Sequence, residues 1–265
     1  MQKSDLKNIN LFLFDMDGTL YLGNRLFSFT NELLATIKAQ GKRYLFMTNN
    51  SSKSVEDYIN KLVGLGIESE YSDFITSSQA TAQYLRKNCT DDKLYVCGTE
   101  SRKAVFRKEG LSITADLKQV DCIGMGFDTE LTFKKLDDVC RLLSTKDVRY
   151  IATNPDYVCP TEYGSVPDCG SVCDMIFNAT GKKPIVIGKP EPAMPLIAMD
   201  MTGYAKSETA VVGDRIYTDI KSGLNAGCKA ILVMSGETTP EILEASDDKP
   251  DLVLESGAEI LEQIK

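Results

Sequence analysis

Short apolar runs alternate with amphipathic segments along the first part of the chain. Residues 9–14 are almost entirely apolar and end at Asp15, a pattern typical of a strand buried on both faces of a parallel sheet. Residues 30–40 carry apolar side chains at helical spacing and are followed by Gly41, a residue type that commonly ends a helix. This stretch therefore predicts a buried strand followed by a surface helix.

A second strand and helix are predicted directly afterwards. The apolar run 43–47 ends at residues of the kind that cap helices, 48–52, and a helical pattern continues to about residue 63. Alternation of strand and helix is the signature of a doubly wound α/β sheet, in which the strands are mainly parallel. We therefore expect a Rossmann-like core.

The same alternation returns near the end of the chain. Strands are predicted at residues 184–187, 209–212, 230–234 and 252–254. Charged residues, Lys189 and Asp214, stand two positions after the first and the second of these strands. In an open α/β sheet the ligand binds beside the carboxyl ends of the strands. The residues that follow the strands are therefore the first candidates for chemistry.

The middle of the chain contains a second set of strands and helices. Its strands are predicted at residues 94–97, 122–127 and 149–152, and the block has enough apolar residues for a hydrophobic core of its own. We therefore predict two domains. Residues 1–76 and 184–265 would form a catalytic core, and residues 77–183 would form an inserted α/β domain.

The composition is that of a globular protein, with 43% hydrophobic and 26% charged residues in a chain of 265. A formal net charge of -8 argues against a nucleic-acid partner, because such binding depends on basic residues that neutralise phosphates. The polar amino terminus does not resemble a signal peptide, and no apolar run is long enough to span a bilayer. We expect a soluble, cytoplasmic protein with no membrane partner. A homodimer is an option that the sequence leaves open.

Histidine is absent from the sequence, which narrows the chemistry. A Ser-His-Asp triad, a Cys-His dyad, a phosphohistidine and a His-ligated zinc are all excluded. The eight cysteines are scattered, and Cys169 and Cys173 are not spaced as a Cys-x-x-Cys motif, so we expect most thiols to be reduced and buried and give a thiolate-bound metal little weight. Catalysis would have to use carboxylates, hydroxyls, lysine and a hard metal ion.

Two acids stand close together at the end of the first predicted strand. Asp15 ends the apolar run, and Asp17 precedes Gly18, whose backbone freedom would let the chain turn so that both acids face one cavity. Two carboxylates this close are costly unless a cation or hydrogen bonds neutralise them. Asp and Gly are also common in ordinary turns, so this segment by itself leaves a turn and a catalytic site equally open.

Four segments of the chain, in order, resemble the motifs of the haloacid dehalogenase (HAD) superfamily. They are Asp15-Met16-Asp17-Gly18-Thr19, Thr48 after the second strand, Lys189 in Gly188-Lys189-Pro190, and Gly213-Asp214-Arg215 with Asp219. The insertion between the second and third segments is similar to that of the NagD-like, or 4-nitrophenylphosphatase, subgroup. In that subgroup the insertion is a cap domain that shapes the substrate pocket. The resemblance covers nearly the whole chain.

The resemblance implies a Mg²⁺-dependent phosphatase that works through an aspartyl-phosphate. Asp15 would be the nucleophile, and Asp17 would protonate the leaving oxygen and then activate a water molecule. Magnesium prefers oxygen ligands, which the Asp15 carboxylate, the Asp17 backbone carbonyl and the Asp214 carboxylate would supply. Asp219 would hold a metal-bound water.

Three further residues are implied to bind the phosphate: Thr48 through its hydroxyl, Lys189 through its charge and Asn49 as an extra donor. Each motif residue also has an ordinary interpretation. Thr48 could cap the following helix, and Lys189 could be a surface lysine. Asp214 could be a turn residue, and Asp219 could be a solvated helix position.

The expected partner is a small-molecule phosphate ester, such as a sugar phosphate or a nucleoside monophosphate, with 4-nitrophenyl phosphate as an artificial substrate. Alternatives are a phosphotransferase or phosphomutase on the same core, and a signalling or binding protein that carries a phospho-Asp. Signalling receiver domains are about half this length and place their lysine after every acid, whereas here Lys189 precedes Asp214.

One segment of the inserted domain departs from the subgroup's pattern. Residues Asn154-Pro155-Asp156 look like the subgroup's Thr-Asn-x-Asp segment, but Asp168 stands where relatives often carry the first glycine of Pro-Gly-x-Gly. Asp156 could form an ordinary Asx turn after a strand. No substrate preference is therefore transferred from a relative.

Overall fold

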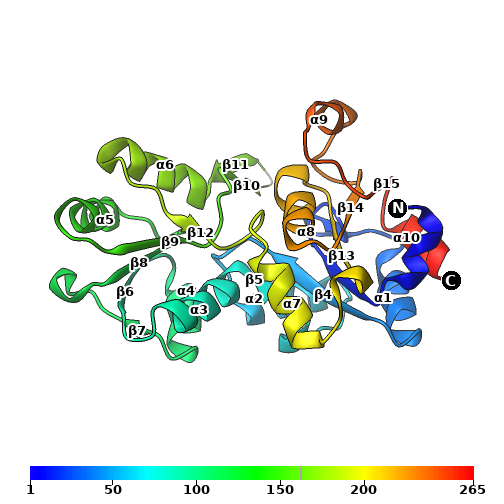
Figure 1. Cartoon of the computed structure of the whole chain (residues 1–265), viewed down its shortest axis with the longest axis horizontal. Helices are drawn as coiled ribbons and strands as arrows, with labels where there is room; N and C mark the ends of the chain where they lie inside the picture. The colour runs from blue at the N-terminus through cyan, green and yellow to red at the C-terminus, as the bar shows by residue number, and fades with distance from the viewer. Residues whose placement is uncertain (162) are drawn as a thin grey trace. The chain divides into compact units, whose positions relative to one another are not determined.

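The computed structural model describes residues 1–161 and 163–265, and their contacts divide the chain into two compact units. The core unit consists of Met1–Thr48, Val55–Ile75 and Lys189–Lys265, and the inserted unit consists of Asn49–Ser54 and Thr76–Gly188 (Figure 1). The boundaries expected from the sequence, at residues 77 and 183, lie within a few residues of the ends of the longer inserted segment. The short segment Asn49–Ser54 was not expected to belong to the inserted unit.

A six-stranded sheet forms the centre of the core unit. Its order is β15 (Leu252–Leu254), β14 (Lys229–Val233), β13 (Thr209–Gly213), β1 (Leu11–Phe14), β4 (Arg43–Thr48) and β5 (Phe74–Thr76). β1 pairs in parallel with both β13 and β4, and β14 pairs in parallel with β13 and β15. The chain adds β4 and β5 on one side of β1 and the later strands on the other, so the strand order reverses at β1. Such a switch point is where open α/β sheets bind ligands.

Helices and a short hairpin complete the core unit. They are η1 (Lys3–Asn8), β2 (Tyr21–Leu22), β3 (Arg25–Leu26), α1 (Thr30–Ala39), α2 (Val55–Gly64), η2 (Tyr71–Asp73), α7 (Ala193–Thr202), η4 (Lys206–Glu208), the π-helix η5 (Ile216–Ile220), α8 (Lys221–Ala226), α9 (Pro240–Ala245) and α10 (Ala258–Ile264). The expected helix at residues 30–40 is confirmed as α1, which buries Leu33 and Ile37 in the same cluster as Phe12 and Phe14 of β1. Burial of each such side chain stabilises the fold by about 1.5–3 kcal/mol relative to exposure.

The inserted unit has a separate five-stranded sheet. Its order is β12 (Ile185–Val186), β9 (Arg149–Ala152), β8 (Cys122–Met125), β6 (Lys93–Cys97) and β7 (Ser112–Ile113), and all neighbouring strands are parallel. Helices α5 (Phe133–Thr145) and α6 (Cys169–Thr180) pack together on one face, and α3 (Ser77–Asn88) and α4 (Glu100–Lys108) pack together on the other (Figure 1). The remaining elements are η3 (Leu117–Gln119) and the hairpin of β10 (Val158–Thr161) and β11 (Gly164–Pro167). The predicted α/β fold class, with a mainly parallel Rossmann-like core and an α/β insertion, is confirmed.

Two expectations about individual elements need correction, and one strand was not anticipated. The strand expected at residues 184–187 to reopen the core is β12, which pairs instead with β9 of the inserted unit. The capping residues 48–52 do not begin a helix, because α2 starts at Val55. β5 was not anticipated, since its three residues, Phe74–Thr76, are too few for a clear apolar run. Among the described residues, no helix is long and apolar enough to cross a membrane.

Candidate active site

Asp15 directly follows β1, at the switch point of the core sheet. Its backbone N–H donates to the carbonyl oxygen of Val212 in β13 at 2.8 Å, which fixes the residue at the end of the paired strands. Its carboxylate accepts a hydrogen bond from the ammonium group of Lys189, with Nζ 2.7 Å from Oδ1. Lys189 is only 2% exposed, so it is not an ordinary surface lysine.

The Lys189 ammonium group links three strand ends. It also donates to Oδ1 of Asp219 at 2.5 Å and to the carbonyl oxygen of Met47 in β4 at 3.2 Å. Burial lowers the pKa of Lys189, but the charges of Asp15 and Asp219 outweigh burial and raise the pKa above its ordinary value. The lysine is therefore a permanent cation beside the two acids.

Asp214 and Asp219 enter the site from the end of β13. Asp214 follows the strand directly, whereas Asp219 lies within η5 and is fully buried, so it is not a solvated helix position. The second oxygen of Asp219, Oδ2, accepts the backbone N–H of Arg215 at 3.1 Å. Gly213 makes room for this arrangement, because a Cβ there would lie 2.3 Å from the Asp219 Cγ.

Residues 235–238, which follow β14, surround Asp214 and were not anticipated from the sequence. The backbone N–H of Glu237 donates to Asp214 Oδ2 at 2.7 Å, and the N–H of Thr238 donates to the Asp214 carbonyl oxygen at 3.2 Å. A Cβ at Gly236 would lie 2.0 Å from Asp214 Oδ2. The available signal was a glycine shortly after a predicted strand, which does not distinguish this loop from an ordinary turn.

Three carboxylates come together at these strand ends. Oxygens of Asp15, Asp214 and Asp219 all lie within 4.8 Å of one another. Burial, opposed by Lys189 and reinforced by Asp219, raises the pKa of Asp15 from 3.8 to about 6. Burial, together with the charges of Asp15 and Asp219, raises the pKa of Asp214 from 3.8 to about 7. When ionised, the three carboxylates carry more negative charge than Lys189 compensates. A bound cation would reduce the repulsion between them.

The donor atoms of this cluster fit a divalent metal ion. Oδ1 of Asp214 is buried and has no hydrogen-bond partner among the described residues. Buried polar atoms are nearly always satisfied, so this oxygen is a natural ligand position. Carboxylate oxygens are hard donors of the kind that Mg²⁺ prefers. Asp15 and Asp214 are the suitable direct ligands, because both oxygens of Asp219 already accept hydrogen bonds, from Lys189 and Arg215.

Asp17 lies apart from this cluster of carboxylates. Its side chain is 53% exposed, with Oδ2 at 3.9 Å from the Lys61 ammonium nitrogen and Oδ1 accepting the N–H of Gly23 at 3.2 Å. The chain turns sharply just after it, since Gly18 has a φ of +85° and donates its N–H to the carbonyl oxygen of Tyr21 at 2.7 Å. The expected turn is therefore present, but the Asp17 carboxylate is exposed to solvent and is not one of the clustered acids, unlike the expectation that both acids would face one cavity.

Thr48 and Asn49 fall on either side of the division between the two units. Thr48 is the buried last residue of β4, and it does not cap α2, which begins seven residues later at Val55. Asn49 belongs to the inserted unit, where its Nδ2 donates to Oδ2 of Asp156 at 2.9 Å. The phosphate-binding roles of Thr48 and Asn49 stay predictions.

Asp168, at the position where a glycine was expected, caps a helix of the inserted unit. Its Oδ1 accepts the N–H of Cys169 at the start of α6 and a hydrogen bond from Asn154 Nδ2 at 3.1 Å. The same Asn154 nitrogen donates to Asp156 Oδ2 at 2.9 Å, and all three side chains are buried. Asp156 and Asp168 thus belong to a buried hydrogen-bond network within this unit.

The fold and the site define a class of protein: a doubly wound α/β protein with a cluster of acids and one buried lysine at its switch point. Residues 12–112 match the haloacid dehalogenase-like hydrolase family, and residues 186–260 match a second, HAD-hydrolase-like family. Two curated relatives are an acid sugar phosphatase of Staphylococcus haemolyticus, 36% identical over 92% of both chains, and the 5'-nucleotidase YutF of Bacillus subtilis, 35% identical over 96% of this chain and 98% of that one.

Solved structures agree with these relatives. A 4-nitrophenylphosphatase of Thermotoga maritima has a TM-score of 0.93 and 40% sequence identity, and the match covers 98% of this chain and 99% of that one. The chain therefore belongs to the haloacid dehalogenase-like hydrolases, in their NagD-like, or 4-nitrophenylphosphatase, subgroup. It is an enzyme of the phosphoric monoester hydrolase class. Phosphatases of this superfamily generally use a divalent metal ion, in agreement with the oxygen donors of the acid cluster.

Proposed function

We propose that this enzyme hydrolyses small phosphomonoesters with Mg²⁺ through an aspartyl-phosphate on Asp15. The observation that carries the proposal is the position of the Asp15 carboxylate: it lies at the switch point, bonded to Lys189 and next to the unpartnered oxygen of Asp214. The proposed nucleophile, the proposed cation for the phosphoryl group and a candidate metal ligand therefore lie close together.

The first chemical step forms a bond between an Asp15 oxygen and phosphorus while the bond from phosphorus to the ester oxygen breaks. The leaving alcohol takes a proton from Asp17. Lys189 holds Oδ1 of Asp15, which orients the carboxylate, and its charge stabilises the phosphoryl oxygens. When bound, Mg²⁺ would supply the positive charge that allows an anionic carboxylate and an anionic phosphate to approach each other.

The second step returns Asp15 to its starting state. A water molecule gives its proton to Asp17 and attacks phosphorus, and the bond between phosphorus and the Asp15 oxygen breaks. Inorganic phosphate is released. Thr48, at the end of the neighbouring strand β4, and Asn49 are proposed to donate hydrogen bonds to the phosphate in both steps.

We infer the substrate class from the names of the relatives. An acid sugar phosphatase and a 5'-nucleotidase both cover more than nine-tenths of this chain, so sugar phosphates and nucleoside monophosphates are the candidate substrates. 4-Nitrophenyl phosphate would serve as an artificial substrate, as the Thermotoga relative's name indicates. The inserted unit is proposed to choose among these esters, as cap domains of this subgroup do.

A panel of phosphate esters assayed in Mg²⁺ tests the proposal. Wild type should release one phosphate per ester consumed, and Asp15→Asn should lose at least about 1,000-fold in kcat/KM because it lacks the nucleophile. EDTA should abolish the activity, and Mg²⁺ should restore it. Asp200→Asn is the matched control, since Asp200 is an exposed acid on α7 of the same unit, and this variant should keep full activity.

Two results would contradict the proposal. Undiminished activity of Asp15→Asn would exclude the aspartyl-phosphate, and undiminished activity in EDTA would exclude the metal. Transfer of the phosphoryl group to a second alcohol without release of phosphate would instead identify a phosphotransferase or phosphomutase.

A further inference from the structure

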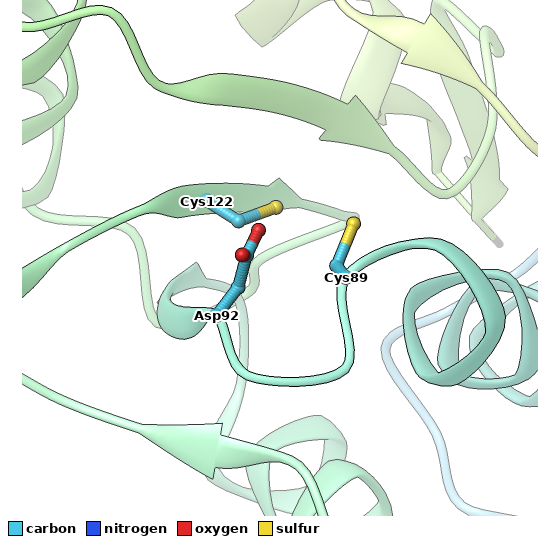
Figure 2. Close-up of side chains that lie close together, drawn as sticks. All are labelled: Cys89, Asp92 and Cys122. Carbon is cyan, nitrogen blue, oxygen red and sulfur yellow. The ribbon is translucent and has the colours of Figure 1, made fainter.

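A second group of potential metal ligands lies in the inserted unit and contains two thiols. Figure 2 shows the side chains of Cys89, Asp92 and Cys122 directed toward a common space. Their sulfur and carboxylate atoms all lie within 4.8 Å of one another. The three residues are distant in sequence from the acids of the core unit, and the phosphatase chemistry does not use them.

The fold brings these residues together where the strands of the inserted sheet begin. Cys89 ends helix α3, and Asp92 follows in a turn closed by its backbone N–H, which donates to the Cys89 carbonyl oxygen at 3.1 Å. Cys122 is the first residue of β8, in register with Arg149, the first residue of β9. The cluster is therefore held by two segments of one unit, the connection between α3 and β6 and the start of β8.

The three side chains differ in their access to solvent. Cys122 is fully buried and Cys89 is 4% exposed, whereas the Asp92 side chain is 17% exposed. Burial raises the pKa of both thiols above its ordinary value, with Arg149 opposing the shift at Cys89. Without a metal the two cysteines are therefore neutral thiols. The cluster is therefore partly accessible to solvent at Asp92. An ion could enter from this side, and a water molecule could serve as a further ligand.

The charge balance also permits a divalent ion. Asp92 forms an ion pair with Arg149, so the group is neutral while both cysteines are protonated. Binding of one divalent cation with release of two thiol protons adds two positive and two negative charges, and the group stays neutral. The buried thiolates would then be compensated by the ion, and the half-exposed Arg149 would need no new partner.

We propose that Cys89, Cys122 and Asp92 bind a zinc-class divalent ion, with water as the fourth ligand. Two thiolates and one carboxylate are ligands that Zn²⁺ accepts in tetrahedral sites, and thiolates select it over Mg²⁺. The ion would join the end of α3 to the first residue of β8. With water in the fourth position the site would be open, unlike closed structural zinc sites that have four protein ligands. The ion would stabilise the inserted unit by linking these segments, without taking part in hydrolysis on Asp15.

Cobalt titration of the reduced, metal-free full-length chain tests this site. Excess Mg²⁺ is present throughout to occupy the acid cluster of the core unit. Co²⁺ bound by thiolates gives intense near-ultraviolet charge-transfer absorption, which oxygen ligands do not give. We expect one equivalent of Co²⁺ to produce this band and Zn²⁺ to remove it by displacing cobalt.

The same cobalt titration of single-residue variants shows which side chains bind the ion. Cys89→Ser and Cys122→Ser should lose the band, whereas Cys140→Ser, which removes a thiol on α5 outside the cluster, should keep it. Asp92→Asn alters the most exposed of the three ligands, so it should fold even where a cysteine variant does not. It should weaken Co²⁺ binding by more than about tenfold.

Several outcomes would overturn the proposal. They are the absence of a thiolate band in wild type, persistence of the band in the Cys89→Ser/Cys122→Ser double variant, and unchanged affinity in Asp92→Asn. Loss of two titratable thiols on mild oxidation in wild type but not in the Cys89→Ser/Cys122→Ser double variant, without any uptake of Co²⁺ by the reduced protein, would identify a disulfide-forming pair instead; the comparison is needed because the sulfurs of Cys169 and Cys173 also lie 3.9 Å apart. None of these results depends on phosphatase activity.

Discussion

Two constraints act on Gly18, the residue that turns the chain after β1. Its φ of +85° is unfavourable for any residue with a side chain, and a Cβ there would lie 2.5 Å from Oδ2 of Asp214. Gly18→Ala should therefore displace the proposed metal ligand in addition to straining the backbone. We expect a loss of about 1 kcal/mol in stability from the strain and a loss in kcat/KM of at least about tenfold, with a higher Mg²⁺ requirement.

Gly41→Ala is the matched control for Gly18→Ala. Gly41 also has a positive φ, +72°, but a Cβ there meets no atom within 4 Å. In urea unfolding, Gly41→Ala should lose about as much stability as the backbone strain costs in Gly18→Ala, and it should keep wild-type activity. If Gly18→Ala retained the wild-type Mg²⁺ dependence, the packing of Gly18 against Asp214 would have no catalytic importance.

The exposed carboxylate of Asp17 leads to a prediction about leaving groups. If Asp17 protonates the departing oxygen, Asp17→Asn should slow alkyl phosphates far more than 4-nitrophenyl phosphate, because nitrophenolate leaves without a proton. We expect the loss in kcat to be at least about tenfold greater for a sugar phosphate. Equal losses for both esters would show that Asp17 does not act as the acid, and Asp57→Asn, an exposed acid on α2, is the control.

At the scale of elements, the buried parallel strands were the most predictable part of the fold. β9 and β15 coincide with the predicted ranges. β1, β4 and β13 differ from them by one or two residues at one end, and β14 differs by one residue at each end. Each is a short apolar run, the pattern that burial on both faces imposes. The partner of β12 could not be predicted in this way, because strand pairing depends on residues far away in the sequence.

The same logic explains which site residues could be found from the sequence. Asp15 and Asp214 directly follow β1 and β13, and residues in these positions meet at one edge of a parallel sheet. Lys189 reaches the same edge although the strand before it, β12, belongs to the inserted sheet, so for this residue the reasoning from strand ends does not hold. The loop at residues 235–238 was missed because it acts on Asp214 mainly through backbone N–H groups, which every residue type has. The bond between Asn49 and Asp156 joins segments 107 residues apart, and local pattern carries no sign of it.

The ends of β1 and β13 bring Asp15 and Asp214 together, and this should make the stability of the protein depend on pH and metal. Their pKa values rise from 3.8 to about 6 and about 7, so the folded state holds these protons more tightly than the unfolded chain. The metal-free protein should therefore lose a few kcal/mol of stability as the pH rises from about 4 to about 7. Mg²⁺ should restore stability increasingly over the same range, because it binds the ionised carboxylates.

Thermal unfolding with EDTA or with Mg²⁺, at pH 4.5 and pH 7.5, measures this effect. Asp214→Asn removes one of the two titrating groups. In EDTA it should be more stable than wild type at pH 7.5 and no more stable at pH 4.5, and it should gain less from Mg²⁺. A metal-free wild type as stable as Asp214→Asn at pH 7.5 would contradict the electrostatic strain inferred for the cluster.

At the scale of the whole molecule, the residues proposed for the chemical steps and those proposed for substrate selection belong mainly to different units. The acids and Lys189 all belong to the core unit, whereas Asn49 and the network of Asn154, Asp156 and Asp168 belong to the inserted unit. Each unit has its own parallel sheet and its own apolar cluster. A change in the network of Asn154, Asp156 and Asp168 should therefore affect substrate preference while leaving the steps on Asp15 intact.

Asp168→Gly tests this separation, because it introduces the glycine that the resemblance to the subgroup predicts at this position. It removes the N-cap of α6 and one acceptor of Asn154, so it should destabilise the protein by about 1–3 kcal/mol. Asp168→Asn is the control, since its side-chain oxygen can still accept both hydrogen bonds. If the inserted unit selects substrates, KM for sugar phosphates and nucleoside monophosphates should change in Asp168→Gly, and kcat for 4-nitrophenyl phosphate should stay within about twofold of wild type. A parallel fall in kcat for every ester, in protein shown to be folded, would mean that the inserted unit also supports the chemical steps.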